Sequence, residues 1–303
     1  MKNKISIIGM GYVGITSAVC FTKLGHSVII VDIDSEKVEK IKAGINPLKE
    51  VKKLDDYLKK NPFEVYLNQH RKAVMDSDIT LVCIQTPTKK NGQLDLMPLK
   101  KVCRTLGQTI KNKKYHIFVI RSTIFPGSLD ILRKEIEKTS GKKCGKDFDL
   151  AVNPEFLREK HAIDDFFDPS FIIVGGKQRI AEKVISLYDK IDAKKFIVSE
   201  GIGQMIKYVS NSFHALKVAY TNEIGTLCKK LGIDGKKLME IFVQDTKLNI
   251  SPYYHTPGKA YGGACLSKDT QVLQTNAKKL KVKCPIIQSI EKSNKEHKKR
   301  GEL

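Results

Sequence analysis

The feature that most constrains this chain is a glycine-rich turn between an apolar segment and a helical pattern. Residues 4–8 read Lys-Ile-Ser-Ile-Ile and are followed directly by Gly9-Met10-Gly11-Tyr12-Val13-Gly14. A second apolar segment, residues 27–32, ends in an acid, Asp32. The order strand, glycines, helix, strand and acid is typical of a βαβ unit that binds a dinucleotide.

Each part of this unit has a chemical task. The first glycine permits the tight turn, the second lets the backbone approach a pyrophosphate, and the third lets the helix pack close to the strand. We therefore expect the cofactor to contact Gly9, Gly11, Tyr12, Val13 and Gly14.

The carboxylate of Asp32 discriminates between the two nicotinamide dinucleotides. It can accept a hydrogen bond from a ribose 2′-hydroxyl, and it repels a 2′-phosphate. The pattern therefore predicts NAD as the cofactor. Lys37, on the helix that follows, is near enough in sequence to join this site. Its positive charge leaves NADP as an alternative.

Strand and helix patterns continue to alternate after Asp32, which predicts an α/β fold with a Rossmann-type, doubly wound parallel sheet. The segments 79–84 and 116–121 lead into polar stretches that contain Thr86 and Thr123. Ligands of such sheets lie beyond the carboxyl ends of the strands, so both threonines are candidates for the cofactor site. The alternative is ordinary capping of a helix or turn. Further strands are expected at residues 149–152, 171–174 and 196–198.

Two glutamates follow the strand at residues 149–152. Glu155 and Glu159 are four residues apart, which on a helix places them on one face. Near a cofactor they could hold sugar hydroxyls or a water molecule, and otherwise they are solvated helix acids. We expect the cofactor domain to span residues 1–199 and a helical central domain to span residues 200–303.

A long helical pattern runs from Glu200 to about Leu231, with apolar residues repeating along one side. A helix of this length is typical of a spine between domains or of a dimer contact. Lys207 and Asn211 lie one turn apart on another face, which His214 continues.

Residues 258–269 combine a flexible backbone with a cysteine. Gly262 and Gly263 allow close approach of a ligand, and Cys265 stands where a helical pattern begins. The unpaired N–H groups at a helix start favour a thiolate, so Cys265 is a candidate nucleophile. Asp269, one turn later on the same face, could orient a water or a lysine beside the sulfur. The alternative is an ordinary buried cysteine ahead of a helix.

Composition narrows the class of protein. The chain has 303 residues, 41% of them apolar, and seven cysteines without a C-x-x-C pair, which predicts a protein of the reducing cytoplasm with neither a disulfide framework nor a zinc site. No apolar run is long enough to cross a membrane. The net charge of +21 comes from 54 Lys and Arg against 33 Asp and Glu. Because no motif interleaves aromatic and basic residues, we interpret this charge as a lysine-rich solvated surface rather than a nucleic-acid site.

The ordered set of motifs resembles the UDP-glucose/GDP-mannose dehydrogenase family, the nucleotide-sugar 6-dehydrogenases. The resemblance is carried, in chain order, by residues 9–14, 85–88, 121–123, 153–159, 206–208, 222–223 and 262–269. The insert at residues 88–96 and the loop at residues 244–254 are most similar to the GDP-mannose branch. UDP-glucose and UDP-N-acetylmannosamine remain alternatives for the sugar nucleotide.

The resemblance implies the oxidation of a primary alcohol to a carboxylate, a four-electron reaction that uses two NAD molecules in turn. It would proceed through a thiohemiacetal and a thioester on Cys265. Lys207 and Asn211 would stabilise the developing oxyanion. Asp269 would position Lys207 or the attacking water.

Other motif residues would hold the reactants. Thr123 and Glu155 would hold the hydrolytic water near the nicotinamide, and Lys268 would contact the cofactor. The resemblance assigns binding of the sugar nucleotide to Glu159, Lys207, Asn211, His214, Asn222, Tyr253, Tyr254 and Gly262. The long apolar-sided helix predicts a homodimer, and the composition and motifs described above predict no nucleic-acid, membrane or metal partner.

The sequence departs from the family at several points. Ser267 replaces the proline of the family's Leu-Pro-Lys-Asp, and Pro252 and Thr256 stand where the GDP-mannose branch carries arginines. The family has a second Rossmann-like domain after the spine helix, whereas this sequence stops at Leu303. We therefore expect NAD binding and dimer formation together with slow turnover. The competing hypotheses are a non-catalytic NAD-binding fragment and a 3-hydroxyacid dehydrogenase, which would not need Cys265.

Overall fold

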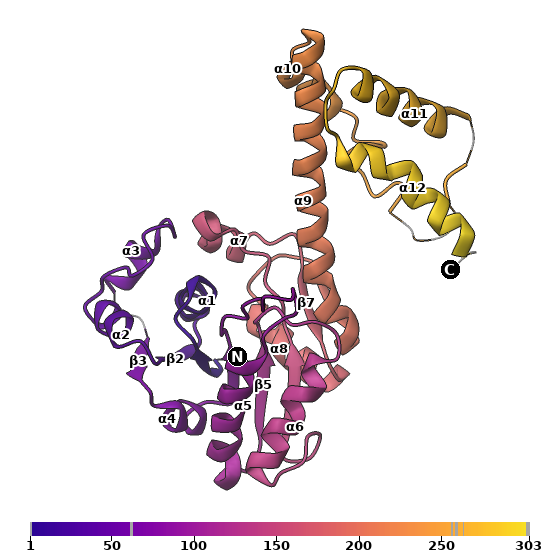
Figure 1. The fold of residues 1–303 in the computed structure, drawn as a ribbon. Coiled ribbons are helices and arrows are strands. Elements are labelled where there is room, and N and C mark those ends of the chain that lie inside the picture. The colour runs from indigo at the N-terminus through magenta and orange to yellow at the C-terminus, as the bar shows by residue number, and fades with distance from the viewer. Residues whose placement is uncertain (1, 61–62, 256, 258–259, 263, 301–303) are drawn as a thin grey trace. The chain divides into compact units, whose positions relative to one another are not determined.

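A computed structural model describes residues 2–60, 63–255, 257, 260–262 and 264–300, and for Ala264 and Cys265 it describes the backbone alone. The chain divides into two compact units, Met1–Val209 and Ser210–Leu303, and Figure 1 shows the elements of each. Within the described residues, every helix is too short or too polar to cross a lipid bilayer.

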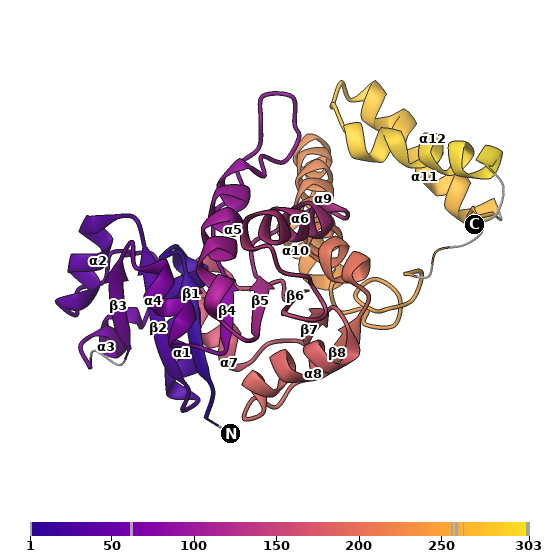
Figure 2. The same cartoon turned by 90° about the horizontal axis from the view of Figure 1, so that it is seen from below.

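The first unit is built on one eight-stranded sheet with the order β3-β2-β1-β4-β5-β6-β7-β8, and Figure 2 shows the strands in this sequence from left to right. The strands are β1 (Lys4–Ile8), β2 (Ser27–Asp32), β3 (Glu64–Leu67), β4 (Ile79–Val82), β5 (His116–Ile120), β6 (Phe148–Val152), β7 (Ile172–Gly175) and β8 (Lys195–Val198). Strands β1 to β6 are parallel and follow the order of a Rossmann-type, doubly wound sheet. The predicted fold class is confirmed.

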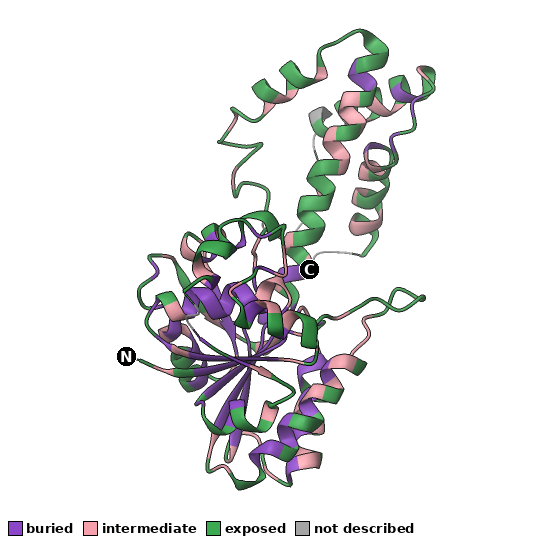
Figure 3. Ribbon diagram, turned by 90° about the vertical axis from the view of Figure 1, so that its left-hand side faces the viewer, coloured by how far each residue is buried: buried purple, intermediate pink, exposed green. Residues whose placement is uncertain are grey.

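Helices cover both faces of this sheet, and Figure 3 shows the buried strands between them. One core packs α1 (Tyr12–Lys23), α7 (Ala162–Phe167) and α8 (Gln178–Ile185) against one face. The other core packs α4 (His70–Met75), α5 (Met97–Thr109) and α6 (Ser128–Ser140) against the opposite face. Because both faces are covered, successive strand residues alternate between the two cores and the central strands are buried almost throughout their length. Polar side chains among them, Ser6, Thr80 and His116, hydrogen-bond to one another. The remaining helical elements of this unit are α2 (Ser35–Lys42), α3 (Leu54–Leu58), η1 (Ile110–Asn112), η2 (Glu159–His161) and η3 (Ser186–Tyr188).

Two features of the sheet differ from the prediction. The sheet is not wholly parallel, because β7 pairs with β6 in the antiparallel sense. The chain between these strands forms only η2 and the short α7, so it does not make the full crossover that a parallel pair requires. Strand β3 was not predicted, because it lies at the edge of the sheet and buries only Val65. A single buried residue gives no alternation of apolar and polar residues from which a strand could be predicted.

The second unit is helical. The predicted long helix is confirmed as α9 (Glu200–Leu231), which begins in the first unit and continues into the second. It is followed by α10 (Gly235–Phe242), α11 (Ala264–Lys279) and α12 (Pro285–Arg300). The carboxylate of Glu223 on α9 caps α12, because it accepts hydrogen bonds from the N–H groups of Ile286 at 2.8 Å and Ile287 at 3.0 Å. A small core supports this arrangement and contains Leu227, Ala277, Val282, Cys284 and Ile287.

A buried arginine ties together three elements of the first unit. Arg121, directly after β5, is 4% exposed. Its Nη1 donates to Asn153 Oδ1 at 2.6 Å and to the Tyr188 hydroxyl at 2.5 Å. That hydroxyl donates in turn to Asn153 Oδ1 at 2.6 Å. A buried charge is costly unless its hydrogen bonds are made, so Asn153 is central to the stability of this end of the sheet.

Replacing Asn153 by leucine should lower the free energy of unfolding by about 3 kcal/mol or more, because Arg121 and Tyr188 lose their shared acceptor inside the core. Urea unfolding followed by circular dichroism measures this change. The matched control is Asn112→Leu at an exposed position of η1, which should change the same quantity by less than about 0.5 kcal/mol. Equal effects of the two substitutions would show that Arg121 does not depend on Asn153.

Candidate active site

Two of the three glycines in the turn between β1 and α1 stand where no side chain fits. Gly9 has a φ of +106°, and a Cβ there would lie 2.6 Å from the carbonyl oxygen of Cys83. A Cβ on Gly14 would lie 1.9 Å from the carbonyl oxygen of Gly9. A Cβ on Gly11 would meet no atom within 4 Å, so the middle of the turn faces open space. No side chain caps the start of α1 at Gly11, which leaves its backbone N–H groups available to a phosphate.

Asp32, at the end of β2, lies beside this turn. Its carboxylate accepts hydrogen bonds from the N–H groups of Met10, of Ile33 at 2.7 Å and of Asp34 at 2.9 Å. These bonds hold the carboxylate at the carboxyl end of β2, which is where the predicted contact with the ribose requires it. Lys37 forms its ion pair with Asp34, at 3.2 Å between Nζ and Oδ2. A contact between Lys37 and the cofactor remains a prediction.

The two predicted threonines lie together at the carboxyl edge of the sheet. The hydroxyl of Thr86, after β4, donates to the carbonyl of Thr123, after β5, at 2.9 Å. A second link runs from the Ser122 hydroxyl to the carbonyl of Ile84 at 2.6 Å. The loops after β4 and β5 are therefore joined beside the switch point of the sheet, which is where ligands of doubly wound folds bind.

A buried ion pair forms the centre of the candidate site. Nζ of Lys207 lies 3.0 Å from Oε1 of Glu155, and the two side chains are 10% and 6% exposed. The Tyr12 hydroxyl donates to the same carboxylate oxygen at 3.5 Å, a long hydrogen bond. The Lys207 ammonium also lies 5.4 Å from the centroid of the Phe156 ring, which adds a cation–π contact. Side chains from the glycine turn, the end of β6 and α9 thus meet at one point.

The predicted shared helix face of Glu155 and Glu159 is wrong. Residues 153–158 have no regular secondary structure, and η2 begins only at Glu159. Pro154 disfavours helical dihedrals at the residue before it, and Oε2 of Glu155 accepts the N–H of Leu157 at 2.6 Å, which competes with helix formation. As a result Glu155 is buried in the site and Glu159 is exposed.

The first turns of α9 place Lys207. Gly203 packs directly on Gly175 of β7, where a Cβ on Gly203 would lie 3.0 Å from the Gly175 Cα. The start of the helix is fixed by Glu200, whose carboxylate accepts two hydrogen bonds from Arg133 at 2.7 and 2.8 Å. Lys207 follows Gly203 by one helical turn, so it falls on the face that meets the sheet. Close backbone packing therefore gives this lysine its position.

The second unit carries most of the residues predicted to bind the sugar nucleotide. Those on α9 are exposed: Asn211, His214 and Asn222. In the loop before α11, Tyr253 and Tyr254 stand edge to face with ring centroids 4.6 Å apart. The next residue, His255, packs edge to face on Phe213 of α9 at 5.1 Å, which holds this loop against the helix. Neither His255 nor Phe213 was predicted as a site residue.

Helix α11 begins at Ala264, so Cys265 lies in the first turn of a helix, as predicted. Three features of the sequence prediction lie outside the described residues: Thr256, Gly263 and the side chain of Cys265. The nucleophilic role of Cys265 therefore remains a prediction. Gly262 is exposed just before the helix, and Asp269 pairs with its neighbour Lys268 at 3.5 Å between Oδ1 and Nζ.

The structure brings some predicted residues together and leaves others untested. Tyr12, Glu155 and Lys207 form one group in the first unit, and Thr86 with Thr123 forms another. Asn211 and Asp269 belong to the second unit, so their contacts with Lys207 remain predictions. The sequence prediction missed the buried network described above, which is made by Arg121, Asn153 and Tyr188. Arg121 and Asn153 each stood in a recognised motif, but no motif contained Tyr188, which comes 67 positions after Arg121 in the chain.

Tyr12 reports on this charge cluster. Burial, followed by the carboxylates of Glu155 and Glu159, raises the pKa of Tyr12 to about 12. Glu155→Gln should therefore lower the pKa of Tyr12 and leave it above its ordinary value of 10.0, because one negative charge is removed while burial persists. NMR of labelled tyrosine rings, with Tyr12→Phe for assignment, measures the shift.

The matched control for this measurement is Glu159→Gln, which removes the same charge from an exposed position. It should lower the pKa of Tyr12 by less than Glu155→Gln does, since Glu159 makes the smaller contribution. A Tyr12 pKa that Glu155→Gln leaves unchanged contradicts the contact between the two side chains.

Two segments that together make up most of the chain match known protein families. Residues 3–192 match the UDP-glucose/GDP-mannose dehydrogenase family, NAD binding domain. Residues 203–296 match the central domain of the UDP-glucose/GDP-mannose dehydrogenase family.

Individual relatives cover both units. The GDP-mannose 6-dehydrogenase of Pseudomonas aeruginosa is 41% identical over 297 residues, which is 96% of this chain and 68% of that protein. The UDP-glucose 6-dehydrogenase AglM of Haloferax volcanii is 33% identical over 279 residues, which is 89% of this chain and 64% of that protein.

Solved structures show the same similarity. A ternary complex of GDP-mannose dehydrogenase from Pseudomonas aeruginosa matches with a TM-score of 0.94 and 40% identity, over 97% of this chain and 69% of that one. A UDP-glucose dehydrogenase from the archaeon Pyrobaculum islandicum matches with a TM-score of 0.78 and 31% identity, over 98% of this chain and 68% of that one.

Proposed function

Because this chain belongs to the UDP-glucose/GDP-mannose dehydrogenase family, we propose that it oxidises the primary alcohol of GDP-mannose to the carboxylate of GDP-mannuronate. Family membership confirms the predicted resemblance, the NAD-binding domain and the dehydrogenase class. GDP-mannose is favoured over UDP-glucose because the chain is 41% identical to a GDP-mannose 6-dehydrogenase and 33% identical to a UDP-glucose 6-dehydrogenase. The observation that supports the chemistry is the buried pair of Lys207 and Glu155 beside the glycine turn.

The proposed reaction has two oxidation steps and one hydrolysis. When bound, NAD accepts the hydride that leaves the reacting carbon, once in each oxidation. The alcohol first loses a hydride and a proton and becomes an aldehyde. The Cys265 thiol then adds to the aldehyde carbon, and the thiohemiacetal loses a second hydride and proton to become a thioester. Water cleaves the thioester, which gives the carboxylate and restores the thiol.

Lys207 is suited to stabilising the oxyanion of these steps. Its ammonium is held in a buried position, where electrostatic interactions are stronger than in water. A preorganised donor of this kind is typically worth about 3 to 4 kcal/mol, and Asn211 would supply a second one. Glu155 would hold the hydrolytic water together with Thr123. Asp269 would orient Lys207 or that water.

The remaining contacts are assigned to exposed residues and to the partly exposed Lys37, which a ligand can reach. Lys268 would contact the cofactor, as would Lys37. The sugar nucleotide would be bound, besides Lys207, by Glu159, Asn211, His214, Asn222, Tyr253, Tyr254 and Gly262. The exposed tyrosines offer both a ring face and a hydroxyl, which suits a ligand with a base, sugars and phosphates. In this proposal the cofactor domain spans residues 1–199 and the central domain residues 200–303.

A homodimer formed through α9 belongs to the same proposal. The second unit exposes large apolar side chains, including Leu216 at 46% and Val218 at 62% on α9 and Ile241 at 63% on α10. Extensive exposed apolar surface usually marks a protein contact. A second copy of the chain is the proposed occupant, because a helix with an exposed apolar side can pair with itself about a two-fold axis.

NAD should bind more tightly than NADP by about tenfold or more, since the Asp32 carboxylate repels a 2′-phosphate. Calorimetry at two salt concentrations measures both dissociation constants, and the difference should be larger at low salt. Asp32→Asn should reduce the difference between the two dissociation constants. Asp34→Asn, which removes a carboxylate from the N-cap of α2, should leave that difference unchanged. Equal constants for the two cofactors in the parent chain would contradict the role of Asp32.

The proposed reaction should yield two NADH for each GDP-mannose consumed, with UDP-glucose oxidised more slowly. Absorbance of NADH and chromatography of the sugar product measure the stoichiometry. Cys265→Ser should abolish formation of the acid, because a serine ester is a poor substitute for the thioester. Cys144→Ser, at a half-buried free thiol, is the matched control and should retain the parental product ratio.

Each alternative outcome of that assay has a definite meaning. Faster oxidation of UDP-glucose overturns the choice of nucleotide and retains the reaction class. Acid formed at the parental rate by Cys265→Ser overturns the covalent mechanism. NADH from neither sugar nucleotide supports the competing hypothesis of a non-catalytic NAD-binding fragment.

A further inference from the structure

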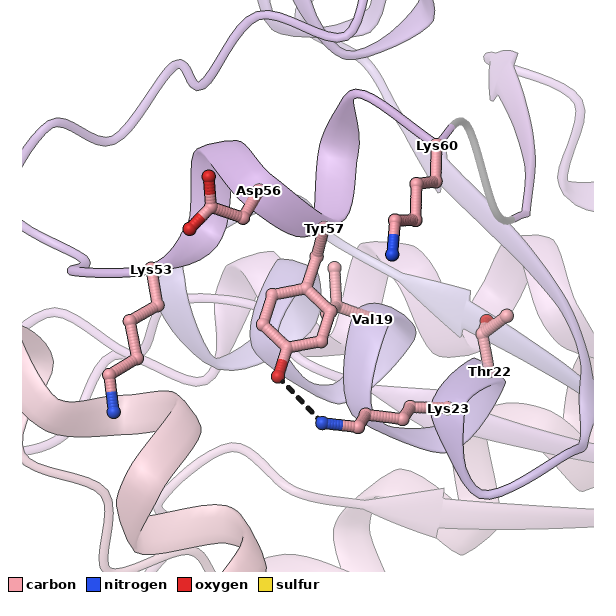
Figure 4. A pocket seen from close by; sticks show the side chains of 7 residues that line it. All are labelled: Val19, Thr22, Lys23, Lys53, Asp56, Tyr57 and Lys60. Atoms are coloured by element: carbon pink, nitrogen blue, oxygen red, sulfur yellow. Dashed lines mark hydrogen bonds between the residues drawn. The ribbon is translucent and has the colours of Figure 1, made fainter.

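A pocket lies at the far end of α1 from the glycine turn, outside the candidate active site. Its volume is about 570 Å³, which falls in the range of small-molecule sites. Figure 4 shows the lining side chains, which come from the end of α1 and from α3 with its flanking residues: Val19, Thr22, Lys23, Lys53, Asp56, Tyr57 and Lys60. Three lysines against one aspartate make the lining positive.

Lys23 contributes a charge that no carboxylate compensates. Its ammonium donates to the Tyr57 hydroxyl at 2.8 Å. It also lies 5.0 Å from the centroid of the Tyr57 ring and 5.0 Å from that of the Phe167 ring. All of these partners are neutral, and within the described part of the chain Lys23 forms no ion pair. Its remaining N–H bonds are therefore available to an anion.

Tyr57 and Lys60 add two more donors. The Tyr57 oxygen accepts from Lys23, so its own proton is left to donate elsewhere. The Lys60 ammonium has neither a hydrogen bond nor an ion pair to any residue that the structure describes, whereas the backbone N–H of Lys60 donates to the Tyr57 carbonyl at 3.4 Å. In Figure 4, Lys23 and Lys60 lie on one side of the Tyr57 ring. Three unused donors thus border the same part of the pocket.

The other charged side chains leave this part of the pocket positive. Lys53 is compensated, because its Nζ lies 2.5 Å from Oδ1 of Asp164. Asp56 and Lys53 both lie on the opposite side of the Tyr57 ring in Figure 4. The carbonyl end of α1 would ordinarily repel an anion. Here the Leu24 carbonyl accepts a hydrogen bond from Lys190 at 2.7 Å, which offsets that effect.

We propose that this pocket binds the phosphate group of a small molecule, held by the ammonium groups of Lys23 and Lys60 and by the hydroxyl of Tyr57. Two ammonium charges match a dianion better than a monoanion, and three separate donors can each meet one phosphate oxygen. The non-phosphate part of the ligand packs against Val19 and the Tyr57 ring. This site is distinct from the dehydrogenase chemistry and does not rest on it.

The test is a titration of the whole chain at saturating NAD, which occupies the dinucleotide site. The probes are inorganic phosphate, mannose 1-phosphate and GMP, which separate a free anion, a sugar phosphate and a nucleotide as sources of the phosphate group. The readout is the NMR signal of the Tyr57 ring in tyrosine-labelled protein, assigned with Tyr57→Phe. We expect a saturable shift of this signal with at least one probe, and none with acetate at equal ionic strength.

The double variant Lys23→Gln/Lys60→Gln should weaken that binding by about tenfold or more. The double variant Lys49→Gln/Lys52→Gln removes the same charge from nearby exposed positions and should leave the dissociation constant unchanged within about twofold. Circular dichroism confirms that both variants fold. Equal weakening by the two double variants, or no saturable Tyr57 shift with any probe up to about 20 mM, overturns the proposal.

Discussion

Two contacts between backbones leave no space for a side chain, and the candidate active site depends on both. Gly14 against Gly9 sets the glycine turn, and Gly203 against Gly175 seats α9 on the sheet. A larger residue at either contact would push a helix away from the strand ends. Tyr12 is carried by the first of these helices and the Lys207 ammonium by the second. The positions of Tyr12 and Lys207 around Glu155 therefore depend on glycine, rather than a larger residue, at these two backbone contacts.

The first unit compensates its buried cations in two ways. Lys207 has a carboxylate partner, Glu155, whereas Arg121 has the neutral oxygens of Asn153 and Tyr188. An ion pair at the edge of a ligand site can exchange one partner for a reactant, because each group remains a strong donor or acceptor. The arginine network lies inside the core with fixed partners. In the proposed function the first arrangement serves the chemistry, whereas the second stabilises the fold.

The sequence prediction succeeded for elements with local signals. The turn at Gly9 to Gly14, the acid at Asp32 and the start of α11 near Cys265 lie where the patterns placed them. It failed for β3, which buries a single residue, and for the glutamate pair, because Pro154 and a local hydrogen bond prevent a helix there. The antiparallel β7 also escaped prediction, since the direction of a strand depends on the path of its connection rather than on its own residues.

By itself, the sequence determined the fold class, the NAD-binding domain and the family of this protein, because glycine turns, apolar periodicity and ordered motifs are properties of short segments. Only the tertiary structure decided which polar residues meet. Tyr12 and Glu155 are 143 positions apart. Lys207 reaches Glu155 only because α9 docks on β7 through two glycines. The network of Arg121 with Tyr188 arises in the same way across 67 positions. Such contacts depend on how whole elements pack, and no local pattern encodes that packing.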